Sequence, residues 1–548
     1  MRTGGELVVA CLEAQGVHHT FGVPGESYLA VLDALHDSDM GFVTCRQEGG
    51  VTYAAEAWGK LTGEPGIAFV TRGPGATNAS VGLHTAMQDS TPMILFVGQA
   101  STGHLDREAF QEIDYRAFLG PIVKWATQID HVERIPEIIS RAFATALSGR
   151  PGPVVVALPE DVLTASTSAS PGRPVRIAEP SPAATQIDEI VALIEWADRP
   201  LLLVGGGGWK AEGRAALQRM AEANDLPVAV VFRYLDLIDN HSPSYVGEAG
   251  VGMQPHVREL IADADLVLAV GIRFGEMTTA GYTLFDMPDA RQTIVHVHPS
   301  DGELGKLVQA EVPVHAGPNT FCAILAEAKI QSSATRAAFC ASARAARVEA
   351  AAPPTQPGEL DMAEVMRWLQ DALPDDAVIT NGAGNFSVWP NKFFSYGPHA
   401  RILGPQSGSM GYGLPAAIAA KVHDPDREVV CFAGDGDIQM NIQELGTAMQ
   451  ANAQPIVLVI NNDMYGTIRM HQEREYPERV SGTEIVNPDY VTLASAYGFH
   501  AERIERTSDF PAAYERARAS ETGALLELMV ERTMLTPTMS IDDIRSSS

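Results

Sequence analysis

The amino-acid sequence predicts an α/β protein built from three doubly wound parallel-sheet domains. Short runs rich in Val, Ile and Leu alternate with helical patterns along the whole chain. Such nearly continuous apolar runs are typical of parallel strands covered by helices on both faces. Two stretches that contain Pro-, Ser- and Ala-rich segments, 164–185 and 331–360, interrupt this alternation. The 548 residues are also too many for a single domain of about 150 residues.

These breaks place the three domains at 1–163, 186–330 and 358–535. Residues 1–16 have the pattern of an amphipathic helix, and the Ser-rich tail after residue 535 is expected to fray. Strands are expected at the apolar runs 66–71, 93–97 and 153–158 of the first domain, 200–204, 227–231, 266–270 and 293–297 of the second, and 377–380, 428–432 and 455–460 of the third.

Composition and charge exclude several classes of function. With 39 Lys+Arg against 68 Asp+Glu, the net charge is −29, which argues against binding to nucleic acid or to an anionic membrane surface. No apolar run is long enough to cross a bilayer, and the start of the chain does not resemble a signal peptide. The five cysteines show no paired spacing, which favours buried, reduced thiols in a cytoplasmic protein.

The strongest chemical signal is the turn Gly434-Asp435-Gly436, which directly follows an expected strand. The Asn pair ending at Asn462 follows the next strand, so Asp435 and Asn462 are expected to lie at the same edge of a parallel sheet. One carboxylate and one amide oxygen, together with phosphate oxygens, are typical Mg²⁺ ligands. The glycines allow close approach of a diphosphate, and a helix expected to begin near Ile438 offers N–H groups to it. Each turn alone could be ordinary, but the pairing favours a cofactor site.

This GDG…NN pattern resembles the signature of enzymes that use thiamine diphosphate (ThDP). Over essentially its full length, the chain resembles the acetolactate synthase/pyruvate oxidase group of that superfamily. The resemblance implies a pyrimidine-binding, a central and a diphosphate-binding domain, in that order. Besides GDGDIQMNIQELGTAMQ (434–450), the motifs that carry it are FGVPG (21–25), RQEGGVTYAAEAWGKLTG (46–63), TRGPGATNASVGL (71–83), DSTPMILFVGQ (89–99), AFQEIDYRAFLGPIVKW (109–125) and SGSMGYGLPAAIAAK (407–421).

By this resemblance, Glu48 is the catalytic glutamate that hydrogen-bonds the aminopyrimidine ring and promotes proton removal from the thiazolium carbon. A glutamate at a helix start is otherwise an ordinary N-terminal charge. Met410 matches the apolar residue that bends the cofactor, where core packing is the plain alternative. Gly408 matches the carbonyl that accepts the amino hydrogen. The remaining implied positions are Asp435, Asn462 and the Met464 carbonyl for Mg²⁺, and Asn385, Phe386, Gly436 and Asp437 for the bound cofactor.

The substrate pocket is where the chain departs from acetolactate synthases. Phe110 and Gln111 match the pair that lines their pocket, and we count Gln111 as catalytic. Met277 replaces an arginine that faces the acceptor keto acid, so recognition of a carboxylate should weaken. His471 replaces a tryptophan and is either a proton donor or a polar pocket-edge residue. Glu26 is either an acid that protonates the reacting carbon or a charge favoured at a helix start.

The resemblance therefore implies a ThDP- and Mg²⁺-dependent carboligase that decarboxylates a 2-oxo acid and ligates it to an aldehyde or a second keto acid. A non-ligating decarboxylase, an aldehyde lyase, an acyl-transferring enzyme and a flavin oxidase remain alternatives. The glycine run 205–208 could approach a phosphate. However, the segments that usually lie beside the flavin in relatives that bind FAD match this sequence poorly, and we expect no FAD. A non-catalytic subunit is disfavoured because Glu48, Asp435 and Asn462 are all present. The family implies a homodimer or homotetramer with active sites at the chain interface.

Overall fold

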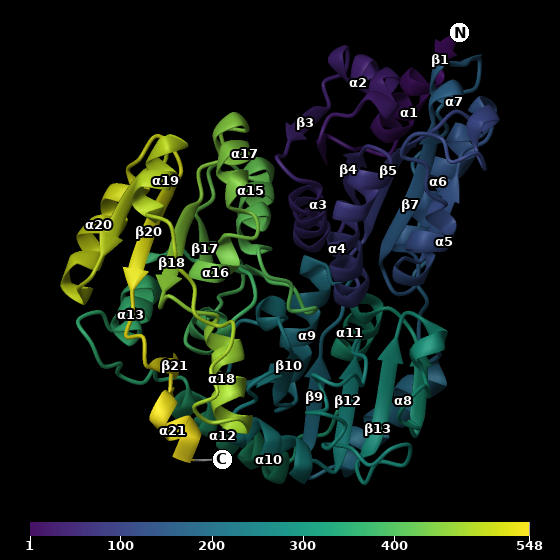
Figure 1. Ribbon diagram of the computed structural model, residues 1–548. Helices are drawn as coiled ribbons and strands as arrows, with labels where there is room; N and C mark the ends of the chain where they lie inside the picture. Colours follow the sequence, from purple (N-terminus) through teal and green to yellow (C-terminus); the bar gives the residue numbers. More distant parts are fainter. Residues whose placement is uncertain (547–548) are drawn as a thin grey trace.

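The computed structural model describes residues 1–546 and contains three six-stranded parallel sheets flanked by helices (Figure 1). The predicted fold class is therefore confirmed. In sheet order, the first sheet consists of β3 (Gly41–Thr44), β2 (His19–Gly22), β4 (Gly66–Val70), β5 (Met93–Gln99), β7 (Pro153–Pro159) and β6 (Trp125–Gln128). Its helices are α1 (Gly4–Ala14), α2 (Leu29–His36), α3 (Glu48–Thr62), α4 (Gly73–Asp89), α5 (Tyr115–Leu119), α6 (Ile135–Leu147) and α7 (Glu160–Thr164).

The second sheet forms the lower part of the molecule in Figure 1. Its order is β11 (Tyr245–Ala249), β10 (Val228–Val231), β9 (Pro200–Val204), β12 (Leu266–Val270), β13 (Thr293–His298) and β14 (Val312–His315). Its helices are α8 (Ala184–Trp196), α9 (Ala211–Ala223), α10 (Pro255–Asp263), α11 (Pro318–Ala326) and α12 (Ala334–Ala350).

The third sheet repeats the arrangement in the C-terminal part of the chain. Its order is β16 (Arg401–Leu403), β15 (Val378–Asn381), β17 (Val429–Gly434), β18 (Ile456–Asn461), β20 (Ala524–Met529) and β19 (His500–Ile504). Its helices are α13 (Met362–Ala372), α14 (Val388–Lys392), α15 (Gly413–His423), α16 (Asp435–Ile438), α17 (Leu445–Gln450), α18 (Gly466–Glu475), α19 (Tyr490–Ala496) and α20 (Phe510–Arg518).

Two local expectations were wrong. The sequence predicts a helix that begins near Ile438. Instead, α16 begins at Asp435 and ends at Ile438, because β17 leads directly into it. The tail does not fray up to residue 546: it forms β21 (Met534–Thr536), β22 (Met539–Ser540) and α21 (Ile541–Ser546). Ile544 of this tail is fully buried and helps to hold the tail against the protein, which the Ser-rich composition of the tail does not indicate. The last two residues, 547–548, lie outside the described part of the chain.

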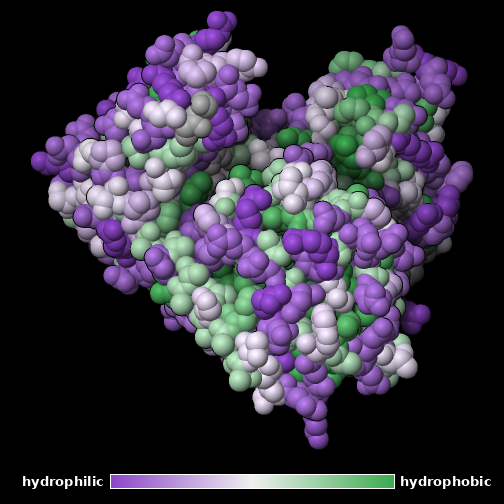
Figure 2. All heavy atoms as spheres, turned by 90° about the horizontal axis from the view of Figure 1, so that it is seen from below, coloured by the Kyte–Doolittle hydropathy of each residue, from purple (hydrophilic) through white to green (hydrophobic). Residues whose placement is uncertain are grey.

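The first and third domains pack against each other through α3 and α15, side by side in the upper part of Figure 1. Small and apolar residues of both helices, such as Ala54, Ala57, Ala416 and Ala420, share one buried cluster. Such side chains let two helices approach closely. Viewed from below, the surface is mostly hydrophilic, with hydrophobic residues gathered near the notch between two lobes (Figure 2). Within residues 1–546, no helix is both long and apolar enough to cross a membrane.

Candidate active site

A cavity of about 350 Å³ lies at the carboxyl ends of β15, β17 and β18. Parallel sheets place ligand sites at this edge, because loops and helix N-termini converge there. Nine of the residues predicted for cofactor or metal binding line this one cavity: Asn385, Phe386, Gly408, Met410, Asp435, Gly436, Asp437, Asn462 and Met464. The tail also contributes to its wall, from Met534 to Pro537.

Asp435 is held firmly at the end of β17. One of its carboxylate oxygens accepts the Gly436 N–H at 2.9 Å, and the other accepts from Asn487 Nδ2 at 2.8 Å. Burial raises the pKa of the Asp435 carboxyl. Asn487 also donates to side-chain oxygens of Asn461 and Asp463, so one amide orders three acceptors beside the cavity. Sequence reasoning missed Asn487, whose Asn-Pro dipeptide signals only a turn.

The donors beside Asp435 suit a hard cation. The Asn462 side chain lines the cavity and makes no hydrogen bond to any described residue. The Met464 carbonyl accepts the Gly466 N–H at 2.9 Å and has a second lone pair to offer. Within residues 1–546, no group of three His, Cys, Asp or Glu side chains could hold a metal by itself. Oxygens of a ligand, such as those of a diphosphate, would therefore have to complete the coordination sphere of a Mg²⁺ ion at this site.

Asp437 joins two loops that form the cavity wall. Its Oδ1 accepts the N–H groups of Ala383 and Gly411, each at 3.0 Å. Burial raises the pKa of the Asp437 carboxyl to about 7, against the opposing effect of these two N–H donors. The first loop leads into Asn385, and the second directly follows Met410, so one buried carboxyl sets the distance between two predicted cofactor contacts.

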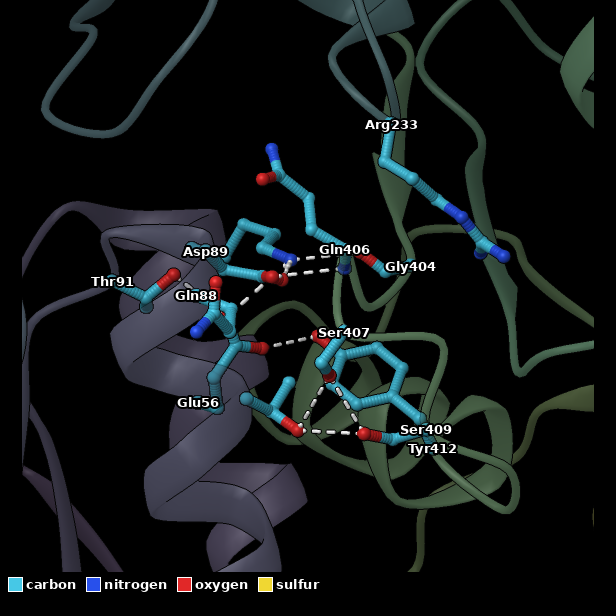
Figure 3. A network of polar contacts seen from close by, with 12 residues as sticks. Glu56, Gln88, Asp89, Thr91, Arg233, Gly404, Gln406, Ser407, Ser409 and Tyr412 are labelled. Carbon is cyan, nitrogen blue, oxygen red and sulfur yellow. Dashed lines mark hydrogen bonds and ion pairs between the residues drawn. The ribbon is translucent and has the colours of Figure 1, made fainter. Parts of the chain in front are cut away.

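The loop that carries Gly408 and Met410 is fixed from the first domain (Figure 3). Lys60 of α3 donates to the Gly404 carbonyl at 2.8 Å, and the Gln406 N–H donates to Asp89 Oδ1 at 2.8 Å. Lys60 also pairs with Asp89. Burial acts to lower the pKa of Lys60, but the charges of Asp89 and Glu56 raise it overall.

Thr85 extends the contact to the two serines beside Gly408, at 3.1 Å from Ser407 Oγ and 2.9 Å from Ser409 Oγ. The burial that isolates this network raises the pKa of the Asp89 carboxyl to about 6. The position of Met410 thus depends on side chains more than 300 residues earlier in the chain.

Glu48 does not line this cavity. It is the first residue of α3, where the side chain of Gln47 caps the helix by accepting the N–H groups of Gly49 and Gly50. Glu48 is half-buried, and its Oε2 accepts from Asn78 Nδ2 at 2.9 Å. Glu26 is exposed at the start of a short 3₁₀ turn and makes no side-chain hydrogen bond to the described residues. A single chain therefore does not bring these glutamates to the cavity.

The segment with Phe110 and Gln111 projects outward. Phe110 is 72% exposed, and Gln111 has a φ of +61°, which is strained for a residue with a side chain. Two bonds from the start of α4 hold this conformation: Arg72 Nη1 donates to the Phe110 carbonyl at 3.2 Å, and the Gly73 N–H donates to the Gln111 carbonyl at 2.9 Å. Sequence reasoning missed Arg72, although it lies inside a quoted motif.

The two other pocket predictions lie elsewhere in the single chain. Met277 is 41% exposed and lines a separate cavity of about 500 Å³ with Gly206, Arg273 and Lys306. His471 is exposed on α18, whose first turn borders the cofactor cavity. The substrate residues are thus not assembled around the cofactor cavity within one protomer.

Three α/β domains, with a cavity at the carboxyl ends of the strands of the third sheet, are typical of a cofactor-dependent enzyme. Residues 2–118, 187–325 and 382–528 match, respectively, the N-terminal TPP binding domain, the central domain and the C-terminal TPP binding domain of the thiamine pyrophosphate enzymes. The chain belongs to this family.

Among its relatives is the acetolactate synthase isozyme 2 large subunit of Escherichia coli, 32% identical over 531 residues, which are 96% of this chain and 95% of that protein. The acetolactate synthase large subunit of Parasynechococcus marenigrum is 33% identical over 549 residues, 97% and 88% of the two chains. The mitochondrial acetolactate synthase catalytic subunit of Saccharomyces cerevisiae is 32% identical over 559 residues, 97% and 81% of the two chains.

The residues present fit thiamine diphosphate. The amide of Asn462 has no partner among the described residues, and the carboxylate of Asp435 lies at the same cavity edge. Gly408, with a φ of +66°, leaves open space where a Cβ would stand, so a ring can approach the backbone there.

Proposed function

We propose that this protein is a ThDP- and Mg²⁺-dependent carboligase. It removes CO₂ from a 2-oxo acid and joins the remaining fragment to the carbonyl carbon of a second molecule, whose oxygen takes up a proton. The observation that carries the proposal is the single cavity that collects all nine cofactor- and metal-binding residues predicted in the third domain. Relatives named acetolactate synthase over nearly the full chain support the ligation step.

Each residue has a defined task. Asp435, Asn462 and the Met464 carbonyl would hold Mg²⁺ together with the diphosphate oxygens, and Met410 would support the cofactor rings. When bound, ThDP supplies a thiazolium carbon that accepts the electron pair released as CO₂ leaves. Glu48 holds a proton at the aminopyrimidine nitrogen, which makes the neighbouring amino group a base for that carbon.

The active unit is at least a homodimer, with a homotetramer as the larger assembly, and it works in the cytoplasm. Glu48 of one protomer then meets the cavity of its partner, which agrees with its absence from the cavity of its own chain. Large apolar side chains, such as Phe110, Ile468 and Val486, are exposed on the single protomer. Their exposure supports the proposal that a second protomer covers part of this surface. The buried, free state of all five cysteines fits a reducing compartment.

For the second substrate, we propose that an aldehyde competes well with a keto acid. Met277 offers no charge to a carboxylate, whereas an arginine would bind one in bidentate fashion. A non-ligating decarboxylase is the second candidate, because Glu26 is exposed, has no internal hydrogen-bond partner, and could deliver a proton to the reacting carbon.

The decisive measurement is the ratio of acetolactate, hydroxyketone and free aldehyde formed from pyruvate plus an aldehyde. We expect hydroxyketone to be prominent, Met277→Arg to shift the ratio towards acetolactate, and Glu26→Gln to reduce any free aldehyde more than the ligated products. Acetolactate as the dominant wild-type product, unchanged in Met277→Arg, would contradict the acceptor assignment. Free aldehyde alone would contradict ligation.

The interface is tested by mixing Glu48→Gln chains with Asp435→Ala chains. If each centre uses residues of two protomers, mixed dimers regain one intact centre and part of the activity. Demonstrated chain exchange without recovery would place each centre within one chain.

A further inference from the structure

Arg233 of the central domain occupies a strained and deeply buried position. It follows β10, has a φ of +69°, and is only 4% exposed. A left-handed backbone is unfavourable for a residue with a long side chain and persists only where the surroundings hold it. Here the Arg233 N–H donates to Glu248 Oε1 at 3.0 Å, which fixes the turn.

The guanidinium of Arg233 reaches out of its own domain into the third one. Its Nη2 donates to the Gly382 carbonyl at 2.9 Å, with a longer contact of 3.4 Å to Ser387 Oγ. Its Nε and Nη1 have no hydrogen-bond partner among the described residues. In Figure 3 the guanidinium points away from Asp89 and the network around it. A buried cation with idle donors opposes folding, so packing alone does not explain this arginine.

The shortest hydrogen bond of the Arg233 guanidinium binds the peptide group between Gly382 and Ala383. The Gly382 carbonyl and the Ala383 N–H belong to the same peptide group, and that N–H donates to Asp437 Oδ1 at 3.0 Å. The peptide is therefore held from both sides, by a cation at its oxygen and by a carboxyl at its nitrogen. It lies two residues before Asn385, at the point where β15 opens into the cofactor cavity.

We propose that Arg233 is a positioning residue for ThDP binding, acting through the Gly382–Ala383 peptide. The central domain thereby sets the orientation of the loop that leads to Asn385, and does so at the expense of folding stability. The inference rests on the cofactor site proposed above and is independent of which acceptor is ligated.

Arg233→Met tests the proposal, because methionine fills much of the volume without the charge or the donors. We expect the dissociation constant for ThDP, titrated calorimetrically with excess Mg²⁺, to rise about tenfold, which is typical for loss of a charge-assisted hydrogen bond. The melting temperature of the cofactor-free variant should equal or exceed that of the wild type. An unchanged dissociation constant, or a drop in the cofactor-free melting temperature without weaker binding, would overturn the proposal.

Arg336→Met is the matched control in the same domain. Arg336 is fully buried and uses its three nitrogens on the carbonyls of Asn224, Ile194 and Gln331. Its loss should lower the melting temperature while the remaining folded protein binds ThDP with wild-type affinity. Equal weakening of ThDP binding in both arginine variants would mean a general effect of stability and would contradict a specific role for Arg233.

A double-mutant cycle with Asp437→Asn keeps the proposal testable if Arg233→Met folds poorly, since Arg233→Lys can take its place. The two substitutions act on one peptide, so their effects on ThDP affinity should be non-additive by threefold or more. Additive effects would overturn the mechanism. Wild-type protein that binds no ThDP in the same titration would instead contradict the cofactor site itself, which separates the two failures.

Discussion

Glu473→Gln should release the C-terminal tail from the wall of the cofactor cavity. Glu473 of α18 is fully buried and accepts from Arg545 Nε at 2.7 Å, Arg545 Nη2 at 2.9 Å and Arg469 Nε at 2.8 Å. The hydrogen bond from Arg545, with support from the Glu478 N–H and Arg469, lowers the pKa of the Glu473 carboxyl to about 2. This carboxylate accepts the two shortest side-chain contacts of Arg545 in α21, a helix of six residues that is too short to be stable alone.

The expected magnitude follows from two of the contacts that hold α21, the Glu473–Arg545 pair and the buried Ile544. Removing one partner of a buried ion pair costs about 3–5 kcal/mol, but Arg545 is 29% exposed, so solvent screening reduces our figure to about 2 kcal/mol. Burial of Ile544, which is 0% exposed, contributes a further stabilisation of about 2 kcal/mol. Losing about 2 kcal/mol raises the population of the detached tail about 30-fold.

Hydrogen exchange across residues 531–546 measures this opening directly. We expect faster exchange there in Glu473→Gln, unchanged protection in the three sheets, and weaker ThDP binding, since Met534–Pro537 lines the cavity. Glu475→Gln, an exposed position on the same helix without an ion pair to any described residue, is the control. Equal tail protection in both variants would refute the reasoning.

The pH dependence of the tail has a defined sign. Because the pKa of Glu473 is lowered in the folded state, its contribution is fully present above the ordinary value of 4.5 and is lost as the pH falls from there towards about 2. Protection of the tail, corrected for the pH dependence of the chemical exchange rate itself, should therefore fall over that window in the wild type, and in Glu473→Gln it should depend less on pH.

Three further substitutions test the site. Glu48→Gln should keep ThDP bound but slow H/D exchange at the thiazolium carbon at least 100-fold; wild-type exchange would contradict the role of Glu48. Asp435→Ala should remove the charged metal ligand and weaken Mg²⁺-dependent ThDP binding at least about tenfold by calorimetry, and unchanged affinity would exclude it as a ligand. Arg72→Met should free the Phe110 carbonyl and raise KM for the 2-oxo acid about tenfold, whereas an unchanged KM would show that the loop holds its shape alone.

The sequence revealed the central strands more readily than the sheet edges. Strands β9 and β12 lie where the apolar runs predicted them, because both faces of a central strand are covered and select Val, Ile and Leu. The edge strand β19, with the sequence HAERI, carries mostly polar residues and gives no such signal. In β20, Glu527 interrupts the apolar run because it accepts a hydrogen bond from Asn461 on the neighbouring strand.

The site divides in the same way between local and distant information. A motif such as GDG lies within a few residues, so its place at a strand end can be anticipated from the sequence. Lys60 and the Gly404 carbonyl are 344 residues apart, and Arg233 and the Gly382 carbonyl are 149 apart. No periodicity or spacing encodes such pairs, since they depend on how whole domains pack.

The helix α3 shows why these distant contacts matter for the proposed chemistry. Its first residue is Glu48. Lys60 lies about 18 Å further along the helix, at about 1.5 Å per residue. Both Lys60 and Glu56 bind the segment that carries Met410 of the same chain. If Glu48 serves the cavity of the partner, one rigid helix fixes the glutamate of one centre and the cofactor loop of the other. The buried charges around Lys60 would then do more than join two domains. They would fix α3 against the loop that carries Met410, and so fix the position of Glu48 in one centre relative to the cofactor loop of the other.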